Sequence, residues 1–159
     1  MQITIVAVGR IKEKFLQEGI AEYMKRLRPY VKLQVIELAE EKRPASATLS
    51  VEKAAMEKEG DRLLASVPAG SYVIVLDVRG SAWSSKELAE SFQRWSLSGK
   101  NHIVFLIGGD LGISPSVIAR GDLRLSLSPM TFTHPIARFL LMEQIYRAQR
   151  IRSGEPYHK

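Results

Sequence analysis

The stretch that decides the fold reads His102-Ile103-Val104-Phe105-Leu106-Ile107-Gly108-Gly109-Asp110-Leu111-Gly112. A continuous apolar run of this length is typical of a strand that is buried on both faces of a sheet. Glycines directly after such a strand allow a ligand to approach the backbone closely. A second run, Leu123–Leu127, is followed in the same way by a small polar loop that ends at Phe132. Because ligands of open α/β sheets bind at the carboxyl ends of strands, the two ends predict one shared site.

Apolar strands alternate with helical patterns along the whole chain. We expect further strands at residues 3–8, 33–38 and 72–78, and helices at 12–27, 51–64, 84–97, after Ser114-Pro115, and from Pro135 to just before Gly154. Ser84 or Ser85 is a typical N-cap, as is Ser114 before its proline. Residues 39–49 are charged, include a proline and predict a mobile loop. The alternation predicts a mainly parallel sheet flanked by helices, in a single domain over residues 1–159.

The composition limits the classes of function. The chain has 159 residues, of which 45% are hydrophobic, and this excludes a disordered protein. It has no cysteine, and no His, Asp or Glu cluster has the spacing of a metal site. No run reaches the roughly 18 apolar residues of a membrane span, and the N-terminus lacks a signal-peptide pattern, so we expect a cytoplasmic protein. The net charge of +6 favours an anionic partner, RNA or DNA first, although a solvated basic surface gives the same value.

The last predicted helix is apolar on nearly all sides. A helix of this kind is buried on many sides, and one sheet covers only one of them. We therefore predict a homodimer with this helix at its interface; the alternative is a central helix within the monomer. One polar stripe holds Glu143 and Arg147, whose spacing is typical of a structural ion pair. Arg138 and Arg152 share the other stripe and are predicted to contact RNA or a substrate carbonyl.

Two loops carry the candidate chemistry. The turn Gly108-Gly109-x-x-Gly112 is neither a phosphate loop nor a dinucleotide fingerprint, and by itself it fits a plain strand-to-helix turn. The loop from Ser126 to Phe132 suits an adenosine-like ring held by backbone hydrogen bonds and apolar contacts.

These motifs resemble those of the large-subunit ribosomal RNA pseudouridine N3-methyltransferases of the SPOUT class. The resemblance runs over the whole chain. It includes the opening Met-x-Ile-x-Ile-x-Ala-Val-Gly at 1–9, the glycine turn, Met-Thr-Phe-x-His at 130–134 and the closing Tyr-His-Lys at 157–159. The family usually has proline where this chain has Thr133.

The resemblance implies an α/β fold whose C-terminal segment threads through a loop to form a trefoil knot. It implies S-adenosylmethionine as cofactor, no metal, a homodimer, and as substrate a pseudouridine in a stem-loop of 23S rRNA within assembled ribosomes. Matched residue by residue, the cofactor positions are Leu76, Gly108, Leu127, Ser128, Pro129, Met130, Thr131 and Phe132.

Methylation at N3 of a pyrimidine requires a base, because the imide nitrogen carries a proton. His134 and His158 are candidates by their ordinary pKa. His134 beside Pro135 also fits a plain helix start, and that interpretation is favoured. The resemblance favours His158, with Tyr157 stacking on a base and Arg152 completing the catalytic set, while Arg138 and Lys159 bind RNA.

Two other classes of function stay open on the residues alone. The basic helix and tail also fit a non-catalytic factor that binds ribosomes. A small nucleotide-binding α/β protein is a third possibility, but the chain lacks the phosphate-loop lysine and the dinucleotide fingerprint.

Overall fold

Strands and helices alternate along residues 1–156, the part of the chain that the computed structural model describes. The elements in chain order are β1 (Gln2–Val8), α1 (Lys14–Leu27), β2 (Lys32–Leu38), α2 (Leu49–Ala65), β3 (Tyr72–Ala82), α3 (Ser85–Leu97), β4 (His102–Ile107), α4 (Pro115–Arg120), β5 (Leu123–Ser126) and α5 (His134–Arg152). This order confirms the predicted α/β class, and residues 39–48 lie outside helices and strands as expected.

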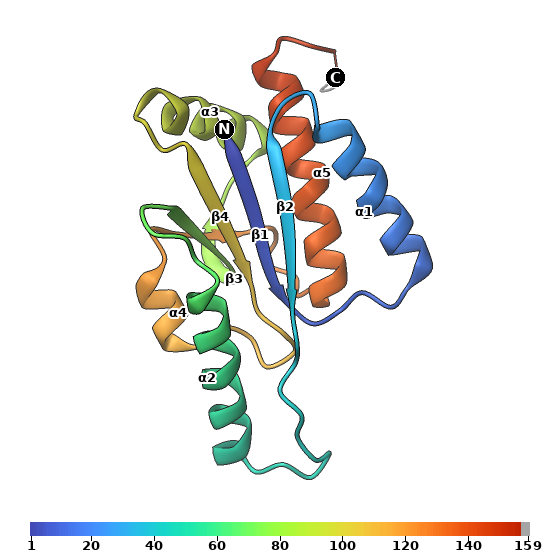
Figure 1. Ribbon diagram of the computed structural model, residues 1–159, viewed down its shortest axis with the longest axis vertical. Helices are drawn as coiled ribbons and strands as arrows, with labels where there is room; N and C mark the ends of the chain where they lie inside the picture. Colours follow the sequence, from blue (N-terminus) through green and yellow to red (C-terminus); the bar gives the residue numbers. More distant parts are fainter. Residues whose placement is uncertain (157–159) are drawn as a thin grey trace.

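All five strands are parallel and follow the order β2-β1-β4-β3-β5 in one sheet (Figure 1). β1 and β4 occupy its interior and are almost fully buried, which explains their uninterrupted apolar sequences. The carboxyl ends of β1, β3, β4 and β5 therefore lie along the same edge of the sheet, where the sequence predicted a site.

The helices cover both faces of the sheet (Figure 1). Successive residues of a strand point to opposite faces, and the two cores follow that alternation. Ile103 and Phe105 pack with α1, α3 and α5, whereas Val104 and Leu106 pack with α2 and α4. The face with three helices carries the larger core.

Helix ends follow the predicted capping residues. Ser84 and Glu87 form a reciprocal capping box at the start of α3, and the Ser114 hydroxyl accepts a hydrogen bond from the N–H of Val117 at the start of α4. Gly154 has φ +65°, as required directly after α5. Only α1 begins later than expected, at Lys14, and its N-cap Glu13 makes no side-chain capping bond.

β3 is longer than the sequence predicted. It continues to Ala82, because its pairing with β5 is interrupted after Leu76 and resumes at Ser81. Gly80 permits this irregularity, since a Cβ there would lie 2.7 Å from the carbonyl carbon of Arg124. Residues 77–80 therefore form a bulge between the two segments of β3 that pair with β5.

α5 has helical neighbours in its own chain. It packs against α1 and α3 as well as the sheet, and none of its residues is fully exposed. Glu143 and Arg147 form the predicted ion pair, with 2.8 Å between their charged groups. The contacts with α1, α3 and the sheet are those expected for a central helix within the monomer, which was the alternative to a helix at a dimer interface. The homodimer and the trefoil knot remain predictions.

Candidate active site

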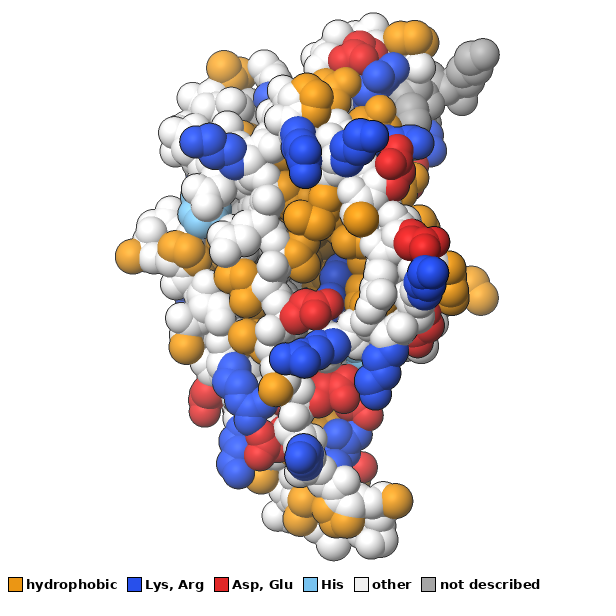
Figure 2. Space-filling model, turned by 45° about the vertical axis from the view of Figure 1, so that its right-hand side comes forward, with side chains coloured by type: hydrophobic (Ala, Val, Ile, Leu, Met, Phe, Trp, Pro, Cys, Tyr) orange, Lys and Arg blue, Asp and Glu red, His pale blue; other side chains and the backbone are white. Residues whose placement is uncertain are grey.

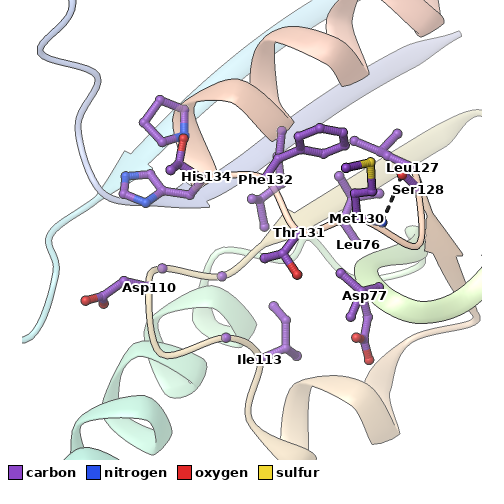
Figure 3. A pocket seen from close by; sticks show the side chains of 18 of the residues that line it. Leu76, Asp77, Asp110, Ile113, Leu127, Ser128, Met130, Thr131, Phe132 and His134 are labelled. Atoms are coloured by element: carbon purple, nitrogen blue, oxygen red, sulfur yellow. Dashed lines mark hydrogen bonds between the residues drawn. The ribbon is translucent and has the colours of Figure 1, made fainter.

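A cavity of about 710 Å³ lies at the carboxyl ends of β3, β4 and β5 (Figure 3). Its volume falls in the range of small-molecule and cofactor sites. The predicted cofactor positions Leu76, Gly108, Leu127, Ser128, Met130, Thr131 and Phe132 line it. Pro129 belongs to the same loop but is not among the lining residues. The two strand ends singled out from the sequence thus contribute to one cavity.

The glycine turn forms one wall and tolerates no side chain at its first position. A Cβ on Gly108 would lie 2.4 Å from the carbonyl oxygen of Gly112. The turn closes through a hydrogen bond from the N–H of Gly112 to the carbonyl of Gly109, 3.1 Å long, and Gly112 has φ +89°. The backbone of the turn therefore faces the cavity directly.

The loop from Ser126 to Phe132 forms the opposite wall. Ser126 Oγ donates to the carbonyl of Ser128, and Ser128 Oγ accepts from the N–H of Met130 at 3.0 Å. The side chains of Met130 and Phe132 are 74% and 38% exposed, and Val78, which also lines the cavity, is 47% exposed. Large exposed apolar side chains gathered around a cavity indicate a binding surface for an apolar ring.

The charged groups on the cavity wall are acidic, although the protein as a whole is basic. Glu13, Asp77 and Asp110 line it, and among the described residues neither Lys nor Arg does. Burial opposes ionisation of Asp77, but hydrogen bonds from Arg124 and from the N–H of Arg79 outweigh it and hold the pKa of this carboxyl below its usual value. The wall therefore favours a cationic ligand over a phosphate-bearing one.

A buried carboxyl supports the glycine turn from behind. Glu59 of α2 is 1% exposed; its Oε1 accepts the N–H of Glu41 at 2.8 Å, and its Oε2 has no hydrogen-bond partner among the described residues. A Cβ on Gly109 would lie 3.2 Å from that Oε2. Burial raises the pKa of Glu59. In addition, Arg43 of the 39–48 loop binds Asp110 of the turn at 2.5 Å, so this loop is attached both to α2, through Glu59, and to the turn.

Arg138, which the sequence predicted to bind RNA, is buried in this structure. Its side chain is 1% exposed, and its guanidinium donates to the Glu37 carboxylate and to the carbonyl of Gly9. It thereby ties the start of α5 to the ends of β1 and β2. Arg138 lines a pocket between α1 and β2 together with Ile11, Met24 and Val35. Figure 2 shows apolar side chains between charged ones on one face of the molecule. The 3.6-residue period placed it on a polar stripe, but only the packing shows that this stripe turns inward.

Arg152, another predicted catalytic residue, does not lie near the cavity in the same chain. Arg152 ends α5, whereas His134 begins it, and 18 residues of helix separate the two by about 27 Å. Figure 1 shows the far end of α5 at the opposite end of the sheet from the strand ends that line the cavity. The guanidinium of Arg152 contacts Gln93 and Gln149. Tyr157, His158 and Lys159 lie outside the described residues.

Sequence reasoning missed several residues of the wall. Asp77 and Val78 are the last two residues of the predicted strand 72–78, so the rule that ligands bind at the carboxyl ends of strands could have found them. Ile113 lies one residue beyond the glycine turn and faces the cavity in Figure 3. Glu13 carried no signal, because the segment between β1 and α1 reaches the cavity only through the chain's path in space.

The chain matches the family model described as "Predicted SPOUT methyltransferase" over residues 1–158. The chain belongs to the SPOUT methyltransferase family. A protein from Methanoregula boonei is 59% identical over the full length of both chains. Relatives from Halothermothrix orenii and Alkaliphilus oremlandii are 51% and 48% identical, again over both full lengths, and are named ribosomal RNA large subunit methyltransferase H.

A solved structure shares the fold of this SPOUT methyltransferase at low sequence similarity. The structure of "a probable methylase family protein" from Haemophilus influenzae Rd KW20 superposes with a TM-score of 0.54 and 15% identity, over 99% of this chain and 70% of that one. Family membership confirms that the protein is a methyltransferase, so it uses a methyl donor. Among the described residues, no group of side chains could hold a metal ion and no helix could span a membrane.

Proposed function

We propose that this chain transfers a methyl group from S-adenosylmethionine to N3 of a pseudouridine in 23S rRNA, acting as a homodimer on assembled ribosomes. The observation that carries the donor assignment is the acidic, apolar cavity at the glycine turn. The RNA assignment rests on relatives about 50% identical over their full length and named as large-subunit ribosomal RNA methyltransferases.

The residues present fit S-adenosylmethionine. This donor is a cation with a sulfonium and an ammonium group. The carboxylates of Glu13, Asp77 and Asp110 line the wall, and those of Asp77 and Asp110 are also paired with Arg124 and Arg43. The exposed Met130 and Phe132 offer apolar contact to the adenine ring. Gly108 lets the turn close without a side chain, because a Cβ there would lie 2.4 Å from the carbonyl oxygen of Gly112, so the donor meets bare backbone at this wall.

For this reaction the protein must orient the methyl donor toward N3 and remove the proton from N3. When bound, the donor supplies an electrophilic methyl group, and the cavity walls orient it. Attack by N3 requires removal of the imide proton, and the resulting negative charge spreads to two carbonyl oxygens. The chain must therefore provide a proton acceptor next to the donor cavity and a cation near the carbonyls.

The C-terminal groups can serve this site only from a second copy of the chain. The helix carries Arg152 about 27 Å away from the cavity end of α5. Glu155 is bound to Arg150 and Tyr30 at that same far end, and the four residues that follow Glu155 span at most about 14 Å. We propose that Arg152, Tyr157, His158 and Lys159 of one copy contact the RNA at the cavity of the other. In this arrangement the active site is complete only in a dimer. This argument for a homodimer is independent of the apolar sides of α5.

Methyl transfer to ribosomes tests the proposal. Ribosomes from a strain that lacks the protein are incubated with the enzyme and methyl-labelled S-adenosylmethionine, and the labelled nucleotide is mapped. We expect label on one pseudouridine of the large-subunit RNA, and far less on the isolated stem-loop. Binding of the cofactor without label on any ribosomal nucleotide would refute the substrate assignment, and absence of binding would refute the donor assignment.

A further inference from the structure

A second, smaller cavity of about 400 Å³ adjoins the donor cavity at the carboxyl ends of β1 and β2. Glu13, His134 and Pro135 line both cavities, so they form the wall between them. A methyl acceptor must lie next to the donor, with the reacting atoms about 3 Å apart. The second cavity shares a wall with the donor cavity, so a methyl acceptor bound in it would lie next to the donor.

The two cavities differ in charge. The donor cavity has no Lys or Arg among its described lining residues, whereas the second one is lined by Arg10 and Lys12 as well as by Glu13 and Glu40. Both side chains are exposed, and neither forms an ion pair within the described part of the chain. Cations at the rim of a cavity large enough for a base are suited to the phosphates of a nucleotide in RNA.

His134 has a defined setting in the shared wall. Its side chain is 16% exposed, and its Nε2 lies 3.5 Å from Oε1 of Glu40. The ring packs against Gly9, where a Cβ would lie 2.4 Å from Nε2 and where φ is +92°. Glycine at this position thus leaves room for the imidazole between the end of β1 and the residue that follows β2.

We propose that the second cavity receives the target pyrimidine nucleotide, with Arg10 and Lys12 at its phosphates and His134 as the group that removes the imide proton. The inference rests on the proposed function. In the step, the N3–H bond breaks and its proton passes to Nδ1 of His134. The electron pair on N3 forms the bond to the methyl carbon, and the pair of the carbon–sulfur bond stays on the sulfur of the donor. The proton then leaves His134 for solvent.

The electrostatic setting supports a neutral imidazole that is ready to accept a proton. Burial lowers the pKa of His134, and nearby Arg138 lowers it further, while the carboxylates oppose this change. The charged groups that face the ring come from four segments: Glu40 after β2, Asp110 after β4, Glu13 before α1 and Arg138 within α5. A neutral imidazole carries one proton, and the Glu40 carboxylate beside Nε2 favours it there, which leaves Nδ1 free to accept. Glu40 is thus a positioning residue.

Nitrogen NMR of the histidine side chains tests the assignment without turnover. In the protein with S-adenosylhomocysteine bound, we expect His134 to carry its proton on Nε2 and to titrate below 6.5, its ordinary value. Glu40→Gln is expected to lower that pKa further, because the carboxylate raises it. A proton on Nδ1 of the neutral ring, or a pKa that rises in Glu40→Gln, would contradict the proposed role.

Kinetics on ribosomes separate the two candidate bases. His134→Asn is expected to lower kcat about 10²- to 10⁴-fold with unchanged affinity for S-adenosylhomocysteine. His102→Asn, a matched change at the amino end of β4, is expected to keep kcat. In Glu40→Gln the acidic limb of the pH–rate profile is expected to move to lower pH. An active natural enzyme whose His134→Asn variant keeps kcat, while His158→Asn loses it, would overturn this inference and leave the proposed function standing.

Charge reversal tests the phosphate contacts. Arg10→Glu and Lys12→Glu are expected each to weaken ribosome binding and to lower the slope of log affinity against log salt by about one. Lys53→Glu, on the outer side of α2, is the matched control and is expected to leave the slope unchanged. Equal slopes in all three variants would mean that the second cavity does not face the RNA backbone.

Discussion

At the scale of the residue, Gly108 is the strictest requirement of the donor cavity. We expect Gly108→Ala to reduce affinity for S-adenosylmethionine at least tenfold, because the new Cβ would lie 2.4 Å from a backbone oxygen that cannot rotate away. Isothermal titration calorimetry measures the affinity. Gly99→Asn is the control, since Gly99 has φ +78° with open space around it, and it should bind normally. Unchanged affinity in Gly108→Ala would remove the glycine turn from the site.

Glu59 predicts a dependence of stability on pH. Burial raises the pKa of its carboxyl, so the folded state binds this proton more tightly than the unfolded chain does. The stabilisation is fully present below the ordinary pKa of 4.5 and is lost as the pH rises through the folded value. We expect Glu59→Gln to be more stable than the natural chain at pH 8 by about 1 kcal/mol, a difference that shrinks toward pH 4.5.

Urea unfolding at several pH values measures this difference. Glu90→Gln, an exposed carboxyl on α3, is the control and should show no such trend with pH. A Glu59→Gln variant that is less stable at every pH would mean that the ionised carboxylate is satisfied in the folded protein.

At the scale of the element, α2 and α4 approach each other at a glycine. A Cβ on Gly60 would lie 2.2 Å from Oγ of Ser114, the N-cap of α4. We expect Gly60→Ala to destabilise the fold by about 1 kcal/mol, because overpacking exceeds the gain in helix propensity. The double variant Gly60→Ala/Ser114→Gly should recover most of the loss, since glycine also serves as an N-cap. Chemical denaturation checks both, and equal losses in the single and double variants would rule out this contact as the cause.

The structural role of Gly60 could not be predicted from the sequence of α2 alone. The sequence predicted a helix over residues 51–64, within α2, because this segment is rich in Glu and Lys, which favour helices. A glycine inside a helix is a weakening feature when the sequence is read alone. Gly60 allows α4 to pack closely against α2, and this contact exists only because the fold places both helices on the same face of the sheet.

At the scale of the whole molecule, the homodimer and the position of the tail can be tested together. One chain carries Gly108→Arg and so has no donor cavity; the other ends at Pro156 and lacks Tyr157–Lys159. Each alone should be inactive. If the tail serves the cavity of the partner copy, co-expression should restore about a quarter of the natural activity, because half of randomly paired dimers are mixed and each has one complete site. If the tail serves its own chain, the mixture stays inactive.

The surface charge of the whole molecule gives no simple map of an RNA interface. Figure 2 shows basic side chains across the upper part of one face and mixed basic and acidic ones below. The net charge of +6 does not show where a donor or an acceptor binds. The two neighbouring cavities do distinguish the proposed sites, because Arg10 and Lys12 line only the second one.

The sequence by itself determined the parallel α/β sheet, the helix caps at Ser84 and Ser114, and the two loops that form the donor cavity. These features are local: apolar period, capping residues and glycines after strands depend on neighbours within a few positions. Only the tertiary structure decided that Arg138 turns inward to Glu37, that Arg152 lies far from the cavity, and that Glu13, Glu40 and His134 meet beside it. These residues come from segments far apart in the chain, and no periodicity along a sequence encodes which segments the strand order brings together.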